Sequence, residues 1–505
     1  MNRRDFVQAT AAVAAVAATG VRAATARRRP NLLYVFSDQH RAASLPGEPF
    51  NQATAPNLDA FRHANFSMDR CVSNYPLCTP YRGILMSGRW PYQTGLTHNN
   101  VALPSNEISL GRVFRDAGYH TGYVGKWHLQ GRGNAFIPAG PDRQGFEDWH
   151  VWARTNAHYR SWTYDPDTGA RVQPDGWNCT TMTDQAITLI ERQHGATKPW
   201  MFMVSWNPPH PPYNPPAQDA ERYPPDQLKL RPNVSFPLQG KPAAGEARPL
   251  TGAEPLREAM QGYYGAITGV DAEFGRLLAA LEASGQAEDT IVVYTSDHGD
   301  MMGSQGRMAK QVPFEESCRV PFFIRYPGVT PKGSRSDTLF AAIDIYPTLC
   351  ALAGLPVPRH CAGRDMSAVM RGGRVEASQA VFLMNQLPHA ADGMAANGED
   401  GDAGETAPDG RARGPRETRP GHQFINQPTY RGLRTDTHTY AVAESGRWCL
   451  YDNVADPFQM RNLVRDPAHQ AMMTGFDKQI GAWLISAGDP FPLADAVTRI
   501  TDFPT

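Results

Sequence analysis

The 505-residue sequence lacks several features that would place it quickly in a functional class. Its formal net charge is −1, so no overall electrostatic field favours nucleic acid or an acidic membrane as a partner. Its seven cysteines include no C-x-x-C pair, which argues against a zinc ribbon or a thioredoxin-type site. No internal repeat is evident, and beyond the N-terminus no apolar run is long enough to span a bilayer. The composition, 41% hydrophobic and 20% charged, instead predicts a globular protein whose anion sites are local.

The first residues are typical of an export signal. Arg3 and Arg4 are adjacent, and an Ala- and Val-rich run follows that is too short and too weakly apolar for a good membrane helix. We predict a twin-arginine signal peptide over residues 1–26, cut between about Ala23 and Ala26, with an uncleaved anchor as the alternative. This prediction makes the twin-arginine translocase a partner and the periplasm or the medium the destination.

Alternating strand and helix patterns predict the fold class. Four continuous apolar runs indicate strands buried on both faces, at 31–37, 119–125, 200–206 and 290–296. A further strand is expected at 320–326. Helical spacing occurs between them, at 56–66, 110–117, 181–194, 259–284 and 344–352. The alternation predicts an α/β fold with a large, mostly parallel sheet flanked by helices.

Composition also suggests how the chain is divided. Residues 27–375 are expected to form the α/β domain, in which 131–178 and 211–255 are predicted to be loops. Residues 388–427 are rich in Gly, Asp, Glu, Arg, Ala and Pro, which predicts a flexible low-complexity insertion, a solvated linker in preference to a lid. Short alternating segments and a last helical stretch near 477–485 predict a smaller C-terminal α+β domain over 428–505.

Each of the four buried strands runs into polar side chains. Ligands of open α/β sheets bind beyond the carboxyl ends of the strands, so these side chains are candidates for a common site. They are Asp38 and Gln39, Lys126 and His128, His210, and Asp297 and His298. Any single group could be loop decoration, but four on one sheet edge indicate a functional site.

The residue types at these strand ends suit a cation and an anionic substrate. Asp38, Gln39 and Asp297 offer oxygen ligands, and His298 offers an imidazole. Such a set favours a hard divalent cation, Ca²⁺ first, with Mg²⁺ or Mn²⁺ as alternatives. Zinc would prefer more nitrogen or sulfur. Charges able to neutralise anionic oxygens are Arg82, Lys126 and Lys310, although either lysine alone could be a solvated surface charge. His128 and His210 are candidate proton-transfer groups.

A thiol lies at the start of a predicted helix. Cys78 precedes Pro80, which suits a first helical turn, and Thr79 is expected to be the N-cap. The helix N-terminus favours an anion, and Arg82 adds a positive charge one turn on. The segment predicts a nucleophile that meets an anionic ester, with a buried structural cysteine as the alternative.

The segment Cys-Thr-Pro-Tyr-Arg-Gly at 78–83 resembles the C-x-P-x-R signature of the type I sulfatases in the alkaline phosphatase superfamily. Other segments resemble landmarks of the same family, at 125–128, 297–299, 310–321, 344–349 and 450–463. The resemblance implies that a formylglycine-generating enzyme oxidises Cys78 to formylglycine, and that residue 78 then also contacts the cation.

The family resemblance also implies roles in the hydrolysis of a sulfate ester. The formylglycine hydrate would attack sulfur, His210 would protonate the leaving alcohol, and His128 would take the proton whose loss allows sulfate to be eliminated. Polar and aromatic loops are expected to contact the alcohol, which is predicted to be a carbohydrate. Their residues are His98, Asn99, Asn100 and the segment 154–164.

One position departs from the family pattern. Many sulfatases have two acids where this chain has Asp38 and Gln39, so its cation site carries less negative charge. The difference leaves phosphonate and phosphate esters open as alternative substrates. A third reading is a catalytically inactive protein that binds sulfated glycans.

Overall fold

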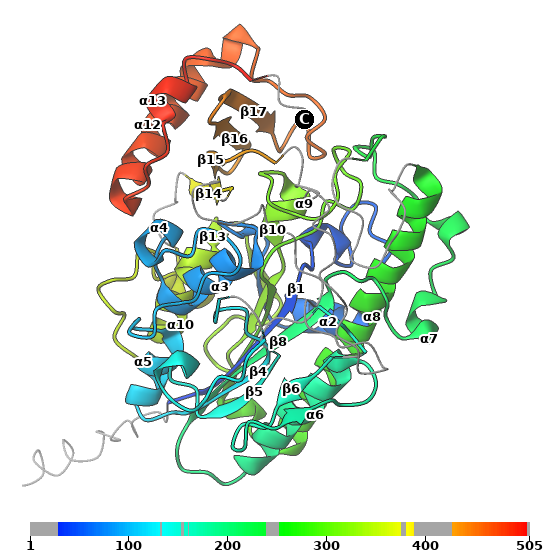
Figure 1. The fold of residues 1–505 in the computed structure, drawn as a ribbon, viewed down its shortest axis with the longest axis vertical. Coiled ribbons are helices and arrows are strands. Elements are labelled where there is room, and N and C mark those ends of the chain that lie inside the picture. Colours follow the sequence, from blue (N-terminus) through cyan, green and yellow to red (C-terminus); the bar gives the residue numbers. More distant parts are fainter. Residues whose placement is uncertain are drawn as a thin grey trace, which may run out of the picture.

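A computed structural model describes residues 29–131, 134–152, 156–159, 161–238, 252–374, 380–387 and 427–501. The predicted signal peptide, and all of the predicted insertion except Gln427, lie outside these residues. A large sheet with helices on both faces forms the centre (Figure 1). In order across the sheet, its strands are β12 (Ser334–Ser336), β2 (Phe66–Met68), β11 (Phe322–Arg325), β9 (Thr290–Ser296), β1 (Asn31–Asp38), β8 (Trp200–Pro209), β4 (His120–Lys126) and β5 (Asp148–Trp152). The predicted α/β fold is confirmed.

Most of the sheet is parallel, and β1 lies at its centre. Strand β1 pairs in parallel with β8 and β9, and β4 pairs in parallel with β8 and β5, whereas β11 runs antiparallel to β9 and β2. Every residue of β1 is buried, because its side chains alternate between two hydrophobic cores on the two faces. Leu32 and Tyr34 enter one core, and Leu33 and Val35 enter the other.

Each core is completed by its own helices. The first core takes apolar side chains from α3 (Cys78–Ser87), α5 (Leu110–Asp116) and α10 (Ala342–Leu352). The second core takes them from α2 (Pro56–Ala64), α6 (Asn178–Arg192) and α8 (Ala253–Ala283). The result is a three-layer arrangement in which the helices leave the carboxyl edge of the parallel strands accessible to loops.

Three parts of the chain differ from the sequence-based expectation. The segment 131–178 was expected to be loop, yet it contributes β5, a five-residue edge strand in which Trp149 and Val151 are buried. The expected strand at 320–326 divides into β10 (Arg319–Val320) and β11 because Pro321 between them has no N–H to donate. Helix α8 begins within the expected loop 211–255, since a proline at 255 falls in the first helical turn, where it is tolerated.

A smaller antiparallel sheet packs on the main domain near the C-terminus (Figure 1). Its strands are β14 (Val381–Asn385), β15 (Tyr430–Arg434), β16 (His438–Ala443) and β17 (Gly446–Asp452). Helix α12 (Gln470–Ala487) covers it and is followed by α13 (Leu493–Ala496). The expected C-terminal α+β unit is confirmed, although its first strand precedes the segment 388–426.

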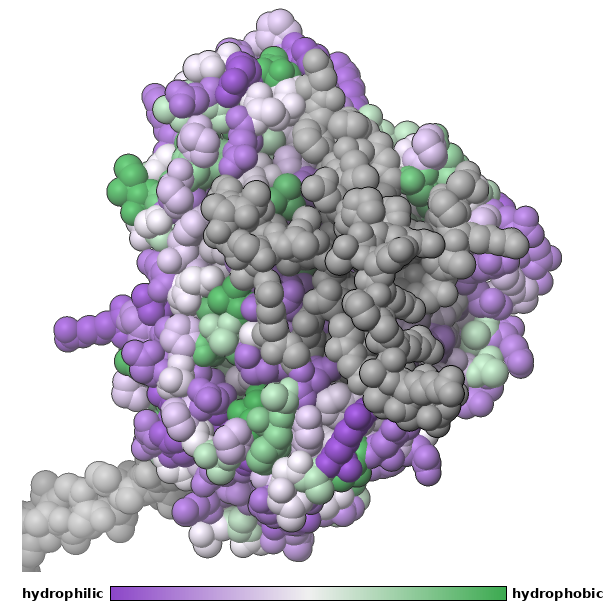
Figure 2. All heavy atoms as spheres, in the orientation of Figure 1, coloured by the Kyte–Doolittle hydropathy of each residue, from purple (hydrophilic) through white to green (hydrophobic). Residues whose placement is uncertain are grey.

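Short elements complete the part of the chain that the structure describes. They are β3 (Cys71–Val72), β13 (Phe340–Ala341), β6 (Thr163–Tyr164), β7 (Arg171–Val172), α4 (Pro91–Thr94), α7 (Ala217–Ala220), α9 (Glu315–Cys318) and α11 (Ser367–Met370). Among the described helices, none has the length and apolar character needed to cross a bilayer. On the face drawn in Figure 2, the coloured hydrophilic and hydrophobic residues are interspersed.

Candidate active site

The carboxyl ends of four parallel strands meet at one edge of the large sheet. Asp38 is the last residue of β1, and Asp297 directly follows β9, its parallel neighbour. Lys126 ends β4, and His210 directly follows β8. The strands β9, β1, β8 and β4 are consecutive in the sheet. The polar side chains expected at strand ends therefore share one edge.

Four potential ligand groups converge where α3 faces this edge. Side-chain atoms of Asp38, Cys78, Asp297 and His298 all lie within 4.8 Å of one another. The Cys78 Sγ lies 3.2 Å from His298 Nε2 and 3.6 Å from Asp38 Oδ1. None of the four residues is more than 1% exposed. Buried carboxylates need compensating charge, so the surroundings of this cluster decide what it can hold.

Two cationic side chains enclose the carboxylates. Arg82 Nη2 lies 3.2 Å from an oxygen of Asp38 and 3.2 Å from an oxygen of Asp297. Lys126 Nζ lies 2.7 Å from Asp38 Oδ2 and 3.9 Å from Cys78 Sγ. Arg82 also donates to Ser205 Oγ and to the carbonyl of Lys126, which fixes its position. The guanidinium therefore holds the two strand ends together, whereas Lys126 lies next to the thiol.

The start of α3 is built differently from the expectation. Cys78 is the first helical residue and Leu77 occupies the N-cap position, so Thr79 is not the N-cap. The Thr79 hydroxyl instead donates to the His128 carbonyl at 2.9 Å, and its N–H donates to Asn99 Oδ1 at 3.0 Å. An amide from another loop thus satisfies a free N–H of the first turn, and Cys78 stays at the positive end of the helix.

A glycine allows β4 to bring Lys126 close to β8. Gly125 has a φ of +103°, and a Cβ at this position would lie 2.0 Å from the Ser205 carbonyl oxygen. Only glycine fits such an approach, since the left-handed region and the missing Cβ are both required. The Gly-Lys-Trp-His segment therefore has a steric reason for its glycine, independent of any chemistry.

The charges set the protonation of the two groups that matter most. Burial alone would raise the pKa of Asp38, but its cationic neighbours, Lys126 first and Arg82 among them, outweigh burial and hold this pKa well below its usual range. Burial, assisted by the charge of Asp38, raises the pKa of the Cys78 thiol to about 12. At neutral pH the carboxylate is therefore ionised and the thiol is protonated.

The cluster has the donor chemistry that a divalent cation requires. Burial lowers the pKa of His298 to about 4, so its imidazole is neutral and able to bind a metal at neutral pH. Two carboxylates and one neutral imidazole in a buried cluster fit a hard cation that also accepts amide oxygens. The residues present therefore fit the cation expected from the sequence.

Lys310 reaches the same edge from a loop. Its Nζ lies 2.7 Å from Gln39 Oε1, and its side chain is buried. The neighbours Ala309 and Gln311 both have positive φ, at +62° and +75°. Such backbone costs on the order of 1–3 kcal/mol per residue and persists only where surrounding contacts impose it. One such contact is the hydrogen bond from Gln427 Nε2 to the Lys310 carbonyl, at 2.6 Å.

The predicted proton-transfer histidines lie in the same region. His128 is buried next to α3, through the contact of its carbonyl with Thr79. His210 Nδ1 lies 2.6 Å from the Pro211 carbonyl, and the residue directly follows Pro209, which is paired with Asp38 in the sheet. A third imidazole, His158, lies in the segment 154–164, which was expected to contact the alcohol and not to transfer protons. Burial and the charge of His210 lower its pKa to about 3.

The residues expected on the substrate side have mixed surroundings. The side-chain oxygen of Asn99 accepts a hydrogen bond from Thr79 N, and His98 Nδ1 lies 3.1 Å from the hydroxyl of Thr97. Asn100 follows them with a φ of +71°. In the aromatic loop, the Arg171 guanidinium lies 3.9 Å above the Trp162 ring. The Trp162 face toward Arg171 is therefore used in packing.

Two polar residues at the site, Asp300 and Ser205, were not identified from the sequence, and a third, Asn156, lies in the segment 154–164 that was expected on the alcohol side. Asp300 accepts from Gln39 Nε2 at 2.5 Å, Asn156 Oδ1 accepts from Lys126 Nζ at 3.2 Å, and Ser205 binds Arg82. The position of Asp300 just after Asp-His-Gly was a usable signal, since it continues a predicted strand end. Ser205 carried no comparable signal, and Asn156 was indicated only as part of a polar and aromatic loop.

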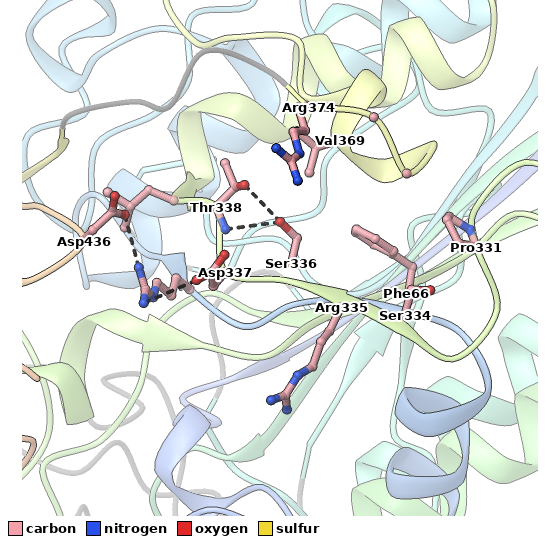
Figure 3. Close-up of a pocket in the computed structure, with 14 residues that line it drawn as sticks. Phe66, Pro331, Ser334, Arg335, Ser336, Asp337, Thr338, Val369, Arg374 and Asp436 are labelled. Carbon is pink, nitrogen blue, oxygen red and sulfur yellow. Dashed lines mark hydrogen bonds and ion pairs between the residues drawn. The ribbon is translucent and has the colours of Figure 1, made fainter.

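Away from this edge, the charged side chains that line a large cavity do not converge on one point. A cavity of about 720 Å³ lies at the β12 edge of the sheet, and its lining includes none of the predicted site residues (Figure 3). Its Arg70 is paired with Asp337 and Asp436, and Figure 3 shows Arg335 pointing away from Arg374. These arginines do not converge on one point, so the strand-end edge remains the candidate active site.

Comparisons with known proteins agree with this placement. A family model described as Sulfatase matches residues 30–355. The chain is 32% identical over 474 residues to the ulvan-active sulfatase of Formosa agariphila, covering 92% of this chain and 83% of that protein. It is 28% identical over 523 residues to the endo-4-O-sulfatase of Bacteroides thetaiotaomicron, covering 92% and 93%.

A solved structure supports the same relationship at the level of the fold. The solved structure is of a protein reported for the metabolism of multiple glycosaminoglycans by Bacteroides thetaiotaomicron, and the chain superposes on it with a TM-score of 0.76. The identity is 26%, and the match covers 94% of this chain and 100% of that one. The similarity thus extends through the small C-terminal sheet as well as the large one.

Proposed function

The chain belongs to the sulfatase family of sulfuric ester hydrolases, and from this premise we propose that it removes sulfate from a carbohydrate sulfate outside the cytoplasm. The observation that carries the proposal is the buried convergence of the Cys78 thiol with two carboxylates, an imidazole and two cationic side chains. The names of two relatives, one for ulvan and one for a 4-O-sulfate, support a glycan as the alcohol.

Conversion of Cys78 to formylglycine is part of this proposal. A thiol with a pKa of about 12 stays protonated at neutral pH and is a poor nucleophile. A formylglycine-generating enzyme would replace it with an aldehyde, whose hydrate supplies an oxygen nucleophile at the same place. The first turn of α3 favours the negative charge that develops there.

The proposed cation site uses Asp38, Gln39, Asp297, His298 and the modified residue 78. Ca²⁺ fits this oxygen-rich set first, with Mg²⁺ or Mn²⁺ as alternatives. When bound, the cation supplies positive charge that stabilises anionic oxygens.

The chain's own side chains then divide the remaining work. Lys126 and Lys310 bind the sulfate oxygens, and Arg82 keeps the carboxylates of Asp38 and Asp297 in place. His210 donates a proton to the leaving alcohol, and His128 accepts one from the nucleophile. Both histidines lie on segments that directly follow strands of the sheet, which fixes their spacing.

The outer part of the site and the targeting of the chain complete the proposal. We assign His98, Asn99 and Asn100 to the alcohol side, because they lie next to α3 on the loop that contacts Thr79. Residues 1–26 act as a twin-arginine signal, and 27–375 with 428–505 form the two domains. Export of a reporter fused to residues 1–26, blocked when both arginines are replaced by lysine, would test the signal.

One mass measurement tests the nucleophile. The peptide that contains Cys78, isolated from protein made in its own host, is expected to have the mass of formylglycine. Sulfate release from ulvan-type oligosaccharides should follow, and should disappear in Cys78→Ala. Unmodified Cys78, in a host that converts a control sulfatase, would overturn the proposal and favour a protein that binds sulfated glycans.

A second substrate class is favoured by one observation. Gln39 gives the cation site a neutral oxygen where an acid would add negative charge, which leaves phosphorus esters open as substrates. Turnover of aryl phosphonate esters is therefore compared with turnover of aryl sulfates. We expect the sulfate ester to have the higher kcat/KM. A higher value for the phosphonate would assign the chain to phosphorus esters on the same scaffold.

A further inference from the structure

Gln39 is held in an unusual conformation at the end of β1. Its φ is +78°, its N–H donates to Asp297 Oδ1 at 3.0 Å, and its carbonyl accepts from Tyr263 Oη at 2.7 Å. The backbone is therefore clamped on both sides, and the side chain leaves it in one direction. These backbone contacts do not fix the amide at the end of the side chain, whose oxygen and nitrogen exchange by rotation about the last side-chain bond.

Two oppositely charged neighbours remove this last freedom. Gln39 Nε2 donates to Asp300 Oδ2 at 2.5 Å, and Lys310 Nζ donates to Gln39 Oε1 at 2.7 Å. A carboxylate only accepts and an ammonium only donates, so the opposite orientation of the amide would break both contacts. Charges at both ends also polarise the amide and increase the negative charge on Oε1.

Asp300 is itself saturated with donors. Its Oδ2 accepts from Tyr213 Oη at 2.6 Å as well as from Gln39, and its Oδ1 accepts from Met302 N at 2.8 Å. The residue is fully buried. Each of its two oxygens therefore faces at least one donor, an arrangement that suits a carboxylate.

We propose that Asp300 is a positioning residue that turns the Gln39 amide oxygen toward the cation and supplies the negative charge that position 39 lacks. The proposal rests on the cation site of the proposed function. The charge lies one contact behind the ligand, so the ligand itself stays neutral while the site as a whole keeps a third carboxylate beside Asp38 and Asp297.

Asparagine cannot replace Asp300 without a mismatch. If the amide oxygen introduced by D300N faced Gln39 and Tyr213, the amide nitrogen would meet the N–H of Met302. The reverse rotamer would turn that nitrogen toward Gln39 Nε2, so two donors would meet there instead. Placing Glu at 39 in the same protein removes the second conflict, because a carboxylate accepts from the amide nitrogen. The double variant Q39E/D300N, which moves the carboxylate from position 300 to position 39, should therefore be tolerated better than D300N, which removes it.

A double-mutant cycle with a binding readout tests this. Metal-stripped wild type, Q39E, D300N and Q39E/D300N are titrated calorimetrically with CaCl₂, and then with MgCl₂ and MnCl₂. D300N is expected to weaken cation binding at least about tenfold, from one unsatisfied buried group. Changing Gln39 to Glu should improve affinity at least about tenfold more in the D300N background than in the wild type. The matched control Asp226→Asn, at an exposed position, should bind like wild type.

Each outcome decides between the two proposals. A wild type that binds no divalent cation would overturn the cation site of the proposed function and this inference with it. A wild type that binds, with additive effects of the two substitutions, would overturn this inference alone. Melting curves in EDTA check folding. If D300N does not fold but Q39E/D300N does, the second substitution rescues the first and supports the proposal. Failure of both variants to fold would contradict a positioning role.

Discussion

The site is built in two ways on its two sides. Asp38 ends β1, and Asp297 and His298 follow β9. The two strands pair from Asn31 to Ser37 and from Thr290 to Ser296, so the sheet sets the spacing of these side chains. Lys310 sits in a loop with left-handed residues on both sides, and side chains hold it, among them Gln39 and Gln427. We call these the strand side and the loop side.

The difference shows how a protein divides stability and adaptability within one site. On the strand side, buried charges depend on one another, so a change there should damage both fold and function. On the loop side, the contacts are single hydrogen bonds, each contributing on the order of 1 kcal/mol. Function should therefore change there with little effect on folding.

The largest effect is expected for Arg82→Met, because Arg82 of α3 pairs with both carboxylates of the strand side. The substitution leaves the carboxylates of Asp38 and Asp297 buried without their shared guanidinium, which should lower the free energy of unfolding by about 3–5 kcal/mol. Sulfate release should be lost as well. Urea denaturation followed by circular dichroism measures the first effect. Arg115→Met, which removes an exposed pair with Asp116, should change stability by less than about 1 kcal/mol, and equal losses in both variants would contradict the contrast.

Lys310→Met should separate function from folding. Loss of one charge that faces the developing transition state is expected to lower kcat/KM about 10²–10³-fold. The free energy of unfolding should fall by only about 1 kcal/mol, because the substitution leaves one neutral amide oxygen, that of Gln39, without its donor but also removes the cost of burying an ammonium group. Steady-state kinetics and denaturation are compared with Lys478→Met on α12. A loss of stability as large as that of Arg82→Met would show that the loop side is equally structural.

Cation binding should stabilise the strand side selectively. At about 100 times its dissociation constant, Ca²⁺ is expected to add about 2.7 kcal/mol to the free energy of unfolding. Asp297→Asn should lose most of this gain, because it removes a proposed ligand, whereas Lys310→Met should keep it. Thermal melts with EDTA or CaCl₂ measure the difference. An equal gain in all three proteins would place the cation outside this cluster.

Gln427→Ala should have a small effect limited to the loop side. Its Nε2 holds the Lys310 carbonyl at 2.6 Å, and loss of this bond should raise KM about 2–10-fold without a change in the melting temperature. Gln470→Ala, at the exposed start of α12, is the control of the same residue type. An unchanged KM would show that the backbone of the loop holds Lys310 without Gln427.

The smallest effect is expected at the opposite, amino-terminal ends of the strands. The hydrogen bond to Asp148, at 2.6 Å, raises the pKa of His120, although burial opposes it. A raised folded-state pKa gives stability that is present below the unfolded value of about 6.5 and is lost as pH rises through the folded value. His120→Asn should therefore cost roughly 0.5–1 kcal/mol at pH 6 and less at pH 9, with activity unchanged. A cost in stability that does not vary with pH would show that the charge of His120 does not cause the stabilisation.

The strand side could be predicted from the sequence because periodicity and sheet physics are sufficient for it. A buried apolar run that stops at Asp38 or Asp297 identifies a strand end, and parallel strands bring such ends to one edge. The edge strand β5 was missed because five alternating residues among glycines and aromatics carry a weak signal. The capping of Thr79 was missed because Asn99, twenty residues away, supplies the oxygen.

On the loop side, the sequence offered only the positive charge of Lys310 and the resemblance of its segment to the family. Nothing in the pattern around Lys310 indicates a buried lysine, and its partner Gln427 comes from 117 residues further along the chain. Asp300 shows the same limit, since its importance lies in three donors from three different segments. Side-chain networks of this kind have no period along the chain, so only the folded structure displays them.

The pairing of β14 with β15 has a consequence for how such a protein can change over time. Asn385 lies opposite Tyr430, and Leu387 N donates to Thr429 Oγ1 at 3.1 Å, so the chain leaves the small sheet before 388 and re-enters it at almost the same point. Doubling the length of a segment between two fixed ends costs only about 0.6 kcal/mol of closure entropy. This junction is therefore a natural graft point: residues can be spliced in, exchanged or removed between two anchored ends, beside the loop that carries Lys310, without redesigning either sheet.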